Sequence, residues 1–180
     1  MFSNSIAKLP SLKSLYLKAS DESSIPPLAI NSCLHLSKLD IKGYMQKFPE
    51  IHEFSQSLTQ LTLEASRLDR DPMVVLEKLP KLLTLRLRAK SYLGQQMHVF
   101  ANGFPQLKVL QLIELREWNK LNIEKGAMPW LMQLQFCFTT KFLGLDELLN
   151  LVEVKIVVSS LEFFFVSKIA GITLWDCTRR

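Results

Sequence analysis

The chain has little of what marks several large classes of protein. Its 180 residues include only three cysteines, six glycines and eight prolines. An odd number of widely separated cysteines does not suit a disulfide framework, so we predict that Cys33, Cys137 and Cys177 are reduced thiols of an intracellular protein. The low glycine and proline content, with 48% hydrophobic residues, excludes a disordered chain. The length predicts one folded domain or two small ones.

Long apolar runs are also absent. The nearest approach, at 157–166, is interrupted by Glu162 and followed by Lys168, so no segment has the apolar length of a transmembrane helix. Residues 1–10 have no basic stretch that leads into a long apolar one, and we therefore read no secretion signal there. These observations predict a cytoplasmic protein without a membrane span.

Motifs of catalysis and of metal or cofactor binding are missing as well. His52-Glu53 begins like a zinc-protease helix, but Gln56 stands where the second histidine ligand is needed. There is no Cys-x-x-Cys pair, no Gly-x-Ser-x-Gly turn and no Gly-x-x-x-x-Gly-Lys-Ser/Thr phosphate-binding loop. We predict no catalytic residue, no metal site and no cofactor, and hence no enzyme.

Leucine, in contrast, is abundant, and its positions are regular. There are 33 leucines, and large apolar residues, mostly leucine, recur in a frame Leu-x-x-Leu-x-Leu, whose copies begin at residues 12, 36, 58, 82, 107, 131 and 151. Side chains of a strand alternate between its two faces, so the fourth and sixth frame positions face the same side. One copy alone cannot bury these side chains, whereas stacked copies bury them against one another.

This frame predicts an α/β fold, a leucine-rich-repeat solenoid or horseshoe of about seven irregular repeats. We expect a parallel sheet on the concave side and mixed short helices and loops on the convex side. Pro10, Pro80, Pro105 and Pro129 each precede a first leucine by two residues, which suits the start of a strand. The string Asp71-Pro72-Met73 predicts a helix N-terminus, with the helix over 72–79.

Both ends and the turns after the strands depart from a regular solenoid. The asparagine expected after each strand is missing, so we expect uneven curvature. Residues 157–180, with the string Phe163-Phe164-Phe165, leave the frame, and we divide the chain into a repeat domain, 1–156, and a divergent tail or cap, 157–180. The stretch before Leu12 is too short to cap the first repeat, which predicts an exposed apolar end and self-association.

Several short strings between Gly43 and Leu134 follow one another in a specific order. They are Lys47-Phe48-Pro49-Glu50, Leu61-Thr62-Leu63 through Ser66-Arg67-Leu68, Asp71-Pro72-Met73, Leu76-Glu77-Lys78-Leu79-Pro80, Ser91-Tyr92-Leu93-Gly94, Gly103-Phe104-Pro105-Gln106-Leu107, Glu117-Trp118 and Gly126-Ala127-Met128-Pro129. In this order they resemble the C-terminal leucine-rich-repeat domain of plant coiled-coil nucleotide-binding (NLR) disease-resistance proteins. The resemblance implies a role in plant defence, in which such a domain recognises a pathogen effector or a guarded host protein and restrains the receptor's nucleotide-binding domain.

We therefore interpret the chain as a protein-recognition module, a fragment or truncated form of such an immune receptor that lacks the nucleotide-binding module. The alternative is a stand-alone leucine-rich-repeat scaffold or adaptor, such as the substrate-recognition subunit of a ubiquitin ligase. Nucleic acid ranks below a protein partner, because only the formal net charge of +5 and one pair of arginines favour it.

The strand residues between the inward leucines are expected to face the concave side. They predict a polar, mostly basic recognition surface formed by Tyr16, Lys18, Asp40, Lys42, Thr62, Glu64, Arg86, Arg88, Gln111 and Gln135. Tyr16 and Arg86 are the expected anchors, because tyrosine and arginine are enriched in binding hot spots. Arg86 and Arg88 share one face of a strand, where they suit a phosphate or an acidic partner. A sheet face that is polar only because it meets solvent is the alternative reading.

For Trp118, burial and exposure for binding both stay open, with burial the more common fate.

Overall fold

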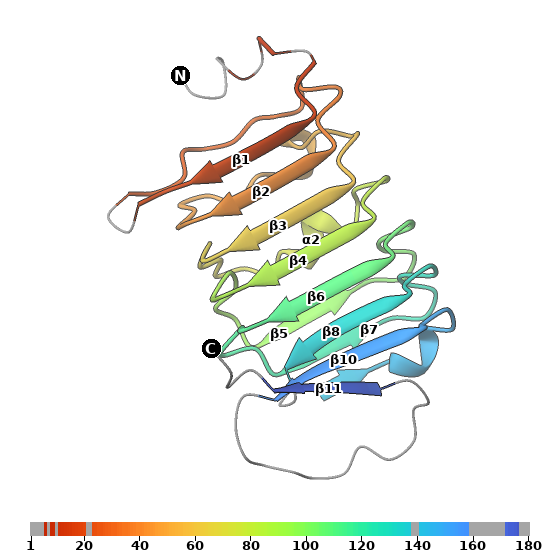
Figure 1. The fold of residues 1–180 in the computed structure, drawn as a ribbon. Coiled ribbons are helices and arrows are strands. Elements are labelled where there is room, and N and C mark those ends of the chain that lie inside the picture. Colours follow the sequence, from red (N-terminus) through yellow and green to blue (C-terminus); the bar gives the residue numbers. More distant parts are fainter. Residues whose placement is uncertain are drawn as a thin grey trace.

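The computed structural model describes residues 6, 8, 9, 11–20, 23–137, 141–158 and 172–176. For residues 137, 141–142, 157–158 and 172–176 it describes the backbone alone. A parallel sheet forms one face of the molecule, with its strands stacked in the order β1-β2-β3-β4-β6-β8-β10-β11 (Figure 1). The strands are β1 (Ser14–Lys18), β2 (Lys38–Lys42), β3 (Gln60–Glu64), β4 (Thr84–Arg88), β6 (Val109–Ile113), β8 (Gln133–Cys137), β10 (Glu153–Val158) and β11 (Ile172–Asp176).

Neighbouring strands of this sheet are parallel, and their register follows the leucine frame. Leu39 of β2 is the partner of Leu15 of β1 on one side and of Leu61 of β3 on the other, and the same alignment continues to β10. The predicted leucine-rich-repeat solenoid with its parallel sheet is therefore confirmed.

The strands start in one repeated way, which fixes this register. Thr59 and Gln60 both donate their backbone N–H to the carbonyl of Ser37, at 2.8 and 2.9 Å, and Leu83 and Thr84 do the same to Thr59, at 2.8 and 3.0 Å. The pattern recurs at the start of β2, β6, β8 and β10. Each strand is thus tied to the preceding strand before the ladder begins, whatever the length of the loop between them.

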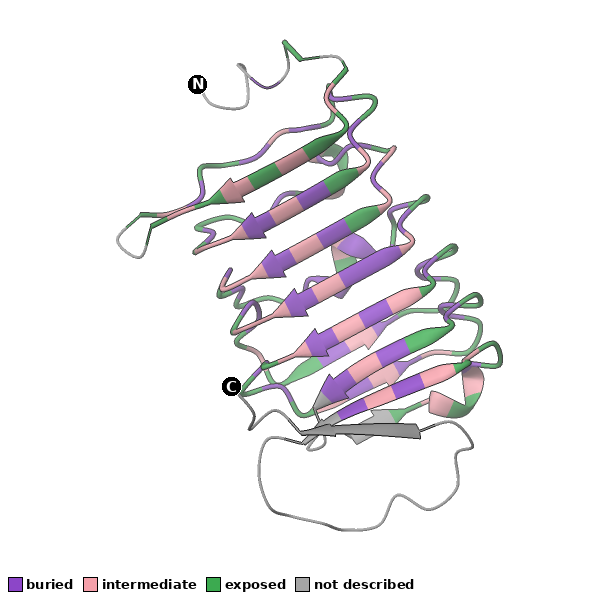
Figure 2. Ribbon diagram, viewed as in Figure 1, coloured by how far each residue is buried: buried purple, intermediate pink, exposed green. Residues whose placement is uncertain are grey.

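The leucine frame builds the core behind the sheet. From the second repeat to the sixth, every frame side chain is at most 6% exposed, and Leu61, Leu85 and Leu110 are fully buried. Figure 2 shows the resulting alternation of buried and less buried positions along the strands. In the first repeat, Leu12, Leu15 and Leu17 are only partly buried. The frame residues therefore face one interior, as predicted.

The convex side differs from the expectation of short helices and loops. In three successive repeats it contains a second parallel sheet of β5 (Gln96–Val99), β7 (Lys120–Ile123) and β9 (Lys141–Leu143), behind the main sheet in Figure 1. Met97 and Val99 are buried while Gln96 and His98 are not, an alternation that was readable in the sequence and that favours a strand. The expectation was wrong for these three repeats.

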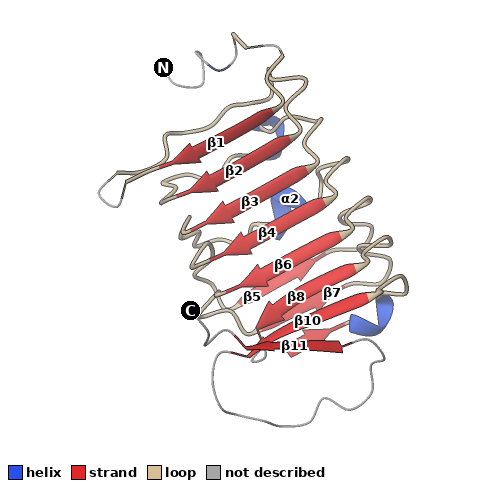
Figure 3. Cartoon of the chain, viewed as in Figure 1, coloured by secondary structure: helices blue, strands red, loops and turns tan. Residues whose placement is uncertain are grey.

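Helical turns cover the convex side elsewhere (Figure 3): η1 (Ile51–Glu53), α2 (Met73–Leu76) and η2 (Leu145–Glu147). The helix predicted over 72–79 is present as α2 but is shorter, because after Leu76 the chain continues in tighter turns, with the N–H of Lys78 donating to Val75 and that of Leu79 to Leu76. The Asp71 carboxylate accepts a hydrogen bond from the N–H of Met73 at 2.9 Å, so it serves the helix start as expected. None of the helices among the described residues is long and apolar enough to cross a bilayer.

Carboxylates accept backbone hydrogen bonds on the convex side. Asp71 also accepts from the N–H of His98 at 2.7 Å, Glu77 from Phe100 at 2.9 Å, and Glu124 from Ala101 at 2.9 Å. Each of these bonds joins one repeat to the next. Burial raises the pKa of Asp71 and that of Glu77, whereas the hydrogen bonds from Ala101 and His98 lower the pKa of Glu124.

The last strand, β11, extends the sheet beyond the predicted frame. Ile172 and Leu174 are the register partners of Val154 and Ile156, two frame positions of the seventh repeat. In the sequence Ile169, Ile172 and Leu174 keep the spacing of the frame, so the frame has an eighth copy. The remainder of the predicted tail, with Phe163-Phe164-Phe165, lies outside the described residues, and the boundary at 156 stays a prediction.

Candidate functional site: the concave surface

The ten residues predicted as a recognition surface lie in two adjacent rows across the main sheet. Strand register aligns the first row, which consists of Tyr16, Asp40, Thr62, Arg86, Gln111 and Gln135. The second row, two residues further along the strands, consists of Lys18, Lys42, Glu64 and Arg88. None of the ten is buried, and Tyr16 is 60% exposed. We call these two rows the concave surface.

Most charges on the sheet face that carries these rows are neutralised by a neighbour. Lys38 lies 3.2 Å from Asp40 within β2, and Lys155 lies 3.1 Å from Glu153 within β10. Lys42 donates to the carboxylate of Glu64 on the next strand. This hydrogen bond and the charge of Glu64 raise the pKa of Lys42. Lysine and acid thus form local pairs in β2, β3 and β10.

The two arginines of β4 are arranged differently. Arg86 Nε and Arg88 Nη2 both donate to the side-chain oxygen of Gln111, at 3.0 and 2.6 Å. The side-chain nitrogen of Gln111 in turn donates to Gln135 at 3.1 Å. Burial, and then the charge of Arg88, lower the pKa of Arg86, while Asp40 opposes this shift. The arginines are therefore held by one neutral amide, that of Gln111.

A hollow of about 400 Å³ lies over these strands. Its charged lining consists of Lys38, Asp40, Lys42, Glu64, Arg86 and Arg88. Tyr16 borders it on the β1 side and Thr62 contributes to its lining from β3. Seven of the ten predicted residues thus line one hollow, and Lys18, Gln111 and Gln135 do not. Gln111 accepts a hydrogen bond from each arginine, and Gln135 accepts one from Gln111.

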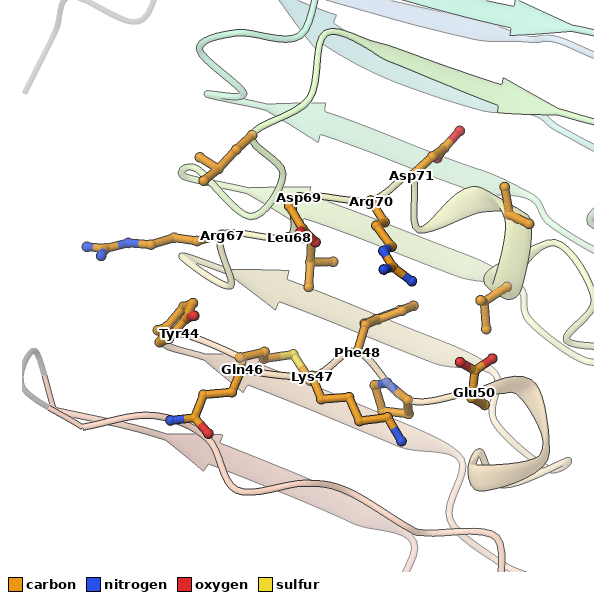
Figure 4. A pocket seen from close by; sticks show the side chains of 15 residues that line it. Tyr44, Gln46, Lys47, Phe48, Glu50, Arg67, Leu68, Asp69, Arg70 and Asp71 are labelled. Atoms are coloured by element: carbon orange, nitrogen blue, oxygen red, sulfur yellow. The ribbon is translucent and has the colours of Figure 1, made fainter.

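A larger cleft, of about 890 Å³, lies in the loops that follow β2 and β3 (Figure 4). Its walls are residues 44–50 and 67–71, with Val74, Val75 and Leu93. One isolated bridge pairs Ile25 with Met45, and another pairs Leu68 with Tyr92. The first joins the loops of the first and second repeats, and the second joins those of the third and fourth. The cleft therefore lies between the second repeat and the third. The concave prediction missed this cleft, although four of the strings that carry the family resemblance contribute residues to its lining.

Two other features noted in the sequence are structural. Trp118 is 2% exposed, so the burial alternative is confirmed for it. His52-Glu53 forms part of η1, where the Glu53 carboxylate accepts from the N–H of Glu50 at 2.8 Å. Within the described part of the chain, no three His, Cys, Asp or Glu side chains lie close enough together to hold a metal ion.

The stacked parallel strands, the buried frame and the polar concave surface define a leucine-rich-repeat protein. A family model described as a leucine-rich repeat region matches residues 1–163, and the chain belongs to this family. Its relatives include the probable disease resistance protein RF45 of Arabidopsis thaliana, 39% identical over 117 residues that cover 64% of this chain and 12% of that protein.

Two further Arabidopsis relatives agree with this placement. Disease susceptibility protein LOV1 is 32% identical over 162 residues, 86% of this chain and 18% of that protein. Disease resistance protein RPP8 is 37% identical over 127 residues, 68% of this chain and 14% of that protein. The resemblance to the repeat domain of plant disease-resistance proteins is therefore confirmed, and the chain spans less than a fifth of the length of these relatives.

Proposed function

We propose that this chain is a protein-recognition module of plant defence that binds its partner through the concave surface and catalyses no reaction. The observation that carries the proposal is that the ten residues fall on two adjacent rows of one open sheet face. The relatives, which are disease-resistance and disease-susceptibility proteins, support the defence role.

The proposed partner is a protein: a pathogen effector, a guarded host protein, or the nucleotide-binding domain of a receptor to which this repeat domain belongs. We propose a cytoplasmic location, since the free thiol of the buried Cys33 suits a reducing compartment. In this proposal the nucleotide-binding module is no part of the chain, because residues 1–180 contain no phosphate-binding loop.

Site-specific photo-crosslinking tests the proposal. A photoreactive amino acid at Thr62 lies on the concave surface, and the same amino acid at Lys120 of β7 is the matched position on the convex sheet. In plant cells that express the chain, we expect Thr62 to crosslink a defined protein that Lys120 does not reach. Identical sets of crosslinked proteins from both positions contradict the concave surface as the binding face.

A second test uses the partner that crosslinks to Thr62. Arg86→Glu reverses the charge at a predicted anchor, and we expect loss of that partner while the circular dichroism spectrum stays unchanged. The ubiquitin-ligase alternative predicts instead that a ligase core subunit co-purifies with the chain. Nucleic-acid binding predicts an affinity for DNA that falls steeply with salt.

A further inference from the structure

The hollow of the concave surface has an uncompensated positive charge at β4. Lys38 and Lys42 each have a carboxylate partner, Asp40 and Glu64. In the described part of the chain no carboxylate lies within 4.0 Å of the side-chain nitrogens of Arg86 or Arg88. The four cations and two carboxylates that line the hollow leave two positive charges, and these belong to one strand.

The two guanidinium groups converge on one point. Both donate to the same oxygen of Gln111, at 3.0 and 2.6 Å, so one oxygen atom is within reach of both groups. An amide oxygen is the weaker acceptor for such donors, because it carries only a partial negative charge, whereas a carboxylate is ionised and accepts two parallel hydrogen bonds from a guanidinium. The geometry is that of a carboxylate receptor occupied by an amide.

Donors remain free for an incoming ligand. Arg86 uses only Nε and Arg88 only Nη2 for Gln111. Arg88 Nε is buried and has no partner among the described residues, so it is not one of the donors that a ligand in the hollow can reach. Each guanidinium thus retains N–H groups that Gln111 does not use, and both side chains line the hollow. Arginine binds carboxylates through two parallel hydrogen bonds when two such donors are available.

The remaining lining favours a singly charged anion. Asp40 and Glu64 line the same hollow, and their charges repel a dianionic phosphate more strongly than a carboxylate. Lys38 and Lys42 are already engaged with these two acids. The hollow therefore offers one anion site, at the arginines, bordered by two fixed negative charges.

We propose that Arg86 and Arg88 receive one aspartate or glutamate side chain of the protein partner, which takes the place of the Gln111 amide. This inference rests on the proposed function and adds the chemistry of the partner: an acidic residue inserted into the hollow is the anchor of the complex. Arg86 and Arg88 bind it directly, and Gln111 occupies their donors until it is displaced.

Substitutions of Gln111 test the proposal with the whole chain and with defined probes. The probes are hexaglutamate and hexaglutamine, and their affinities are measured by titration at low salt with nuclear magnetic resonance. We expect hexaglutamate to bind more tightly than hexaglutamine, with shifts centred on β4 and β6. Gln111→Glu places a carboxylate of the chain itself against the two arginines. The affinity for hexaglutamate therefore falls about tenfold or more, and the melting temperature of the chain rises. Gln111→Leu removes the amide and leaves the arginines free, so affinity stays equal or increases.

Matched charge variants complete the test. The double variant Arg86→Gln with Arg88→Gln should lose its affinity for hexaglutamate. The control is Lys81→Gln with Lys125→Gln, which changes two exposed lysines outside the hollow. It removes the same net charge and should retain the affinity for hexaglutamate. Equal affinities of the two double variants overturn the proposal, and so does a lower melting temperature for Gln111→Glu. Tighter binding of a phosphoserine peptide than of hexaglutamate overturns the carboxylate assignment.

Failure of this inference is distinguishable from failure of the proposed function. If hexaglutamate does not bind but Thr62 still crosslinks a partner that Lys120 does not, the carboxylate receptor is wrong and the recognition role stands. If neither is observed, the concave surface is not the binding face.

Discussion

The first repeat and the central repeats have the same leucine frame but bury it to different extents. Leu61, Leu85 and Leu110 are fully buried, whereas Leu15 and Leu17 of β1 are only partly buried. The central strands have a neighbour on both sides, while among the described residues β1 is paired only with β2. The difference teaches that the frame supplies apolar side chains, but that the adjacent repeats complete their burial.

The largest expected effect on this comparison comes from alanine substitutions at equivalent frame positions. Leu110→Ala removes a fully buried side chain between two repeats, and we expect the free energy of unfolding to fall by about 2–5 kcal/mol. Leu15→Ala removes a side chain that already meets solvent, so we expect a loss of about half that size or less. Urea denaturation followed by circular dichroism measures both, and equal losses break the comparison.

The sequence predicted the parts of this fold that depend on periodicity. The buried frame, the parallel sheet and the alignment of the concave residues all follow from one repeated spacing, as with Leu39 between Leu15 and Leu61. The convex side was predicted less well, because its segments differ from repeat to repeat. The sheet β5-β7-β9 was missed for this reason, although Met97 and Val99 alternate with polar residues.

The side-chain contacts within the candidate site could not be predicted from the sequence either. Spacing placed Arg86 and Arg88 on one face of a strand, but their shared acceptor, Gln111, lies on β6 after a connection that contains β5. A choice between Gln111 and Glu64 as partner of Arg88 depends on side-chain conformation, which periodicity does not define. The larger cleft of Figure 4 depends on the shapes of two loops, and no motif of the sequence describes those.

Two glycine substitutions sharpen the comparison at close backbone approaches. A Cβ at Gly103 comes within 2.7 Å of the Glu77 carboxylate and 2.9 Å of the carbonyl oxygen of Phe100, inside the central repeats. We expect Gly103→Ala to lower the free energy of unfolding by about 1–3 kcal/mol, measured by urea denaturation.

The matching glycine beside the first repeat is Gly43. It has φ +129°, and a Cβ there comes within 2.7 Å of the Ala19 Cβ. Because the segment with Ala19 follows β1, the first strand of the described sheet, we expect Gly43→Ala to loosen residues 11–20 with a smaller global loss. Hydrogen exchange measured by mass spectrometry should show faster exchange in this segment alone, and faster exchange throughout the central strands contradicts it.

The buried Glu77 gives the central repeats a pH dependence. Burial raises the pKa of Glu77 above its ordinary value of 4.5, so the folded chain holds this proton more tightly than the unfolded chain does. The contribution of Glu77 to stability is therefore fully present below pH 4.5 and falls as the pH rises through the higher pKa of the folded state.

Glu77→Gln tests this dependence. The amide oxygen can still accept the hydrogen bond from Phe100 but carries no charge, so we expect the free energy of unfolding to fall less between pH 4.5 and neutral pH than in the unchanged chain. Urea denaturation at several pH values measures the two slopes. Since Asp71, whose pKa burial also raises, remains in the variant, part of the slope should persist; identical slopes in both proteins contradict the role of Glu77.

The smallest expected effect concerns the edge of β1 opposite β2, where no described strand pairs with it. An edge strand presents unpaired backbone groups, and the partly buried Leu15 and Leu17 add apolar surface beside them. We expect light scattering of the isolated chain to show a mass that rises with concentration. Proline is tolerated at the first residue of a strand, where it removes a donor, so Ser14→Pro should reduce this association, while Ser11→Pro, in the turn before the strand, should not. A monomer at high concentration contradicts the expectation.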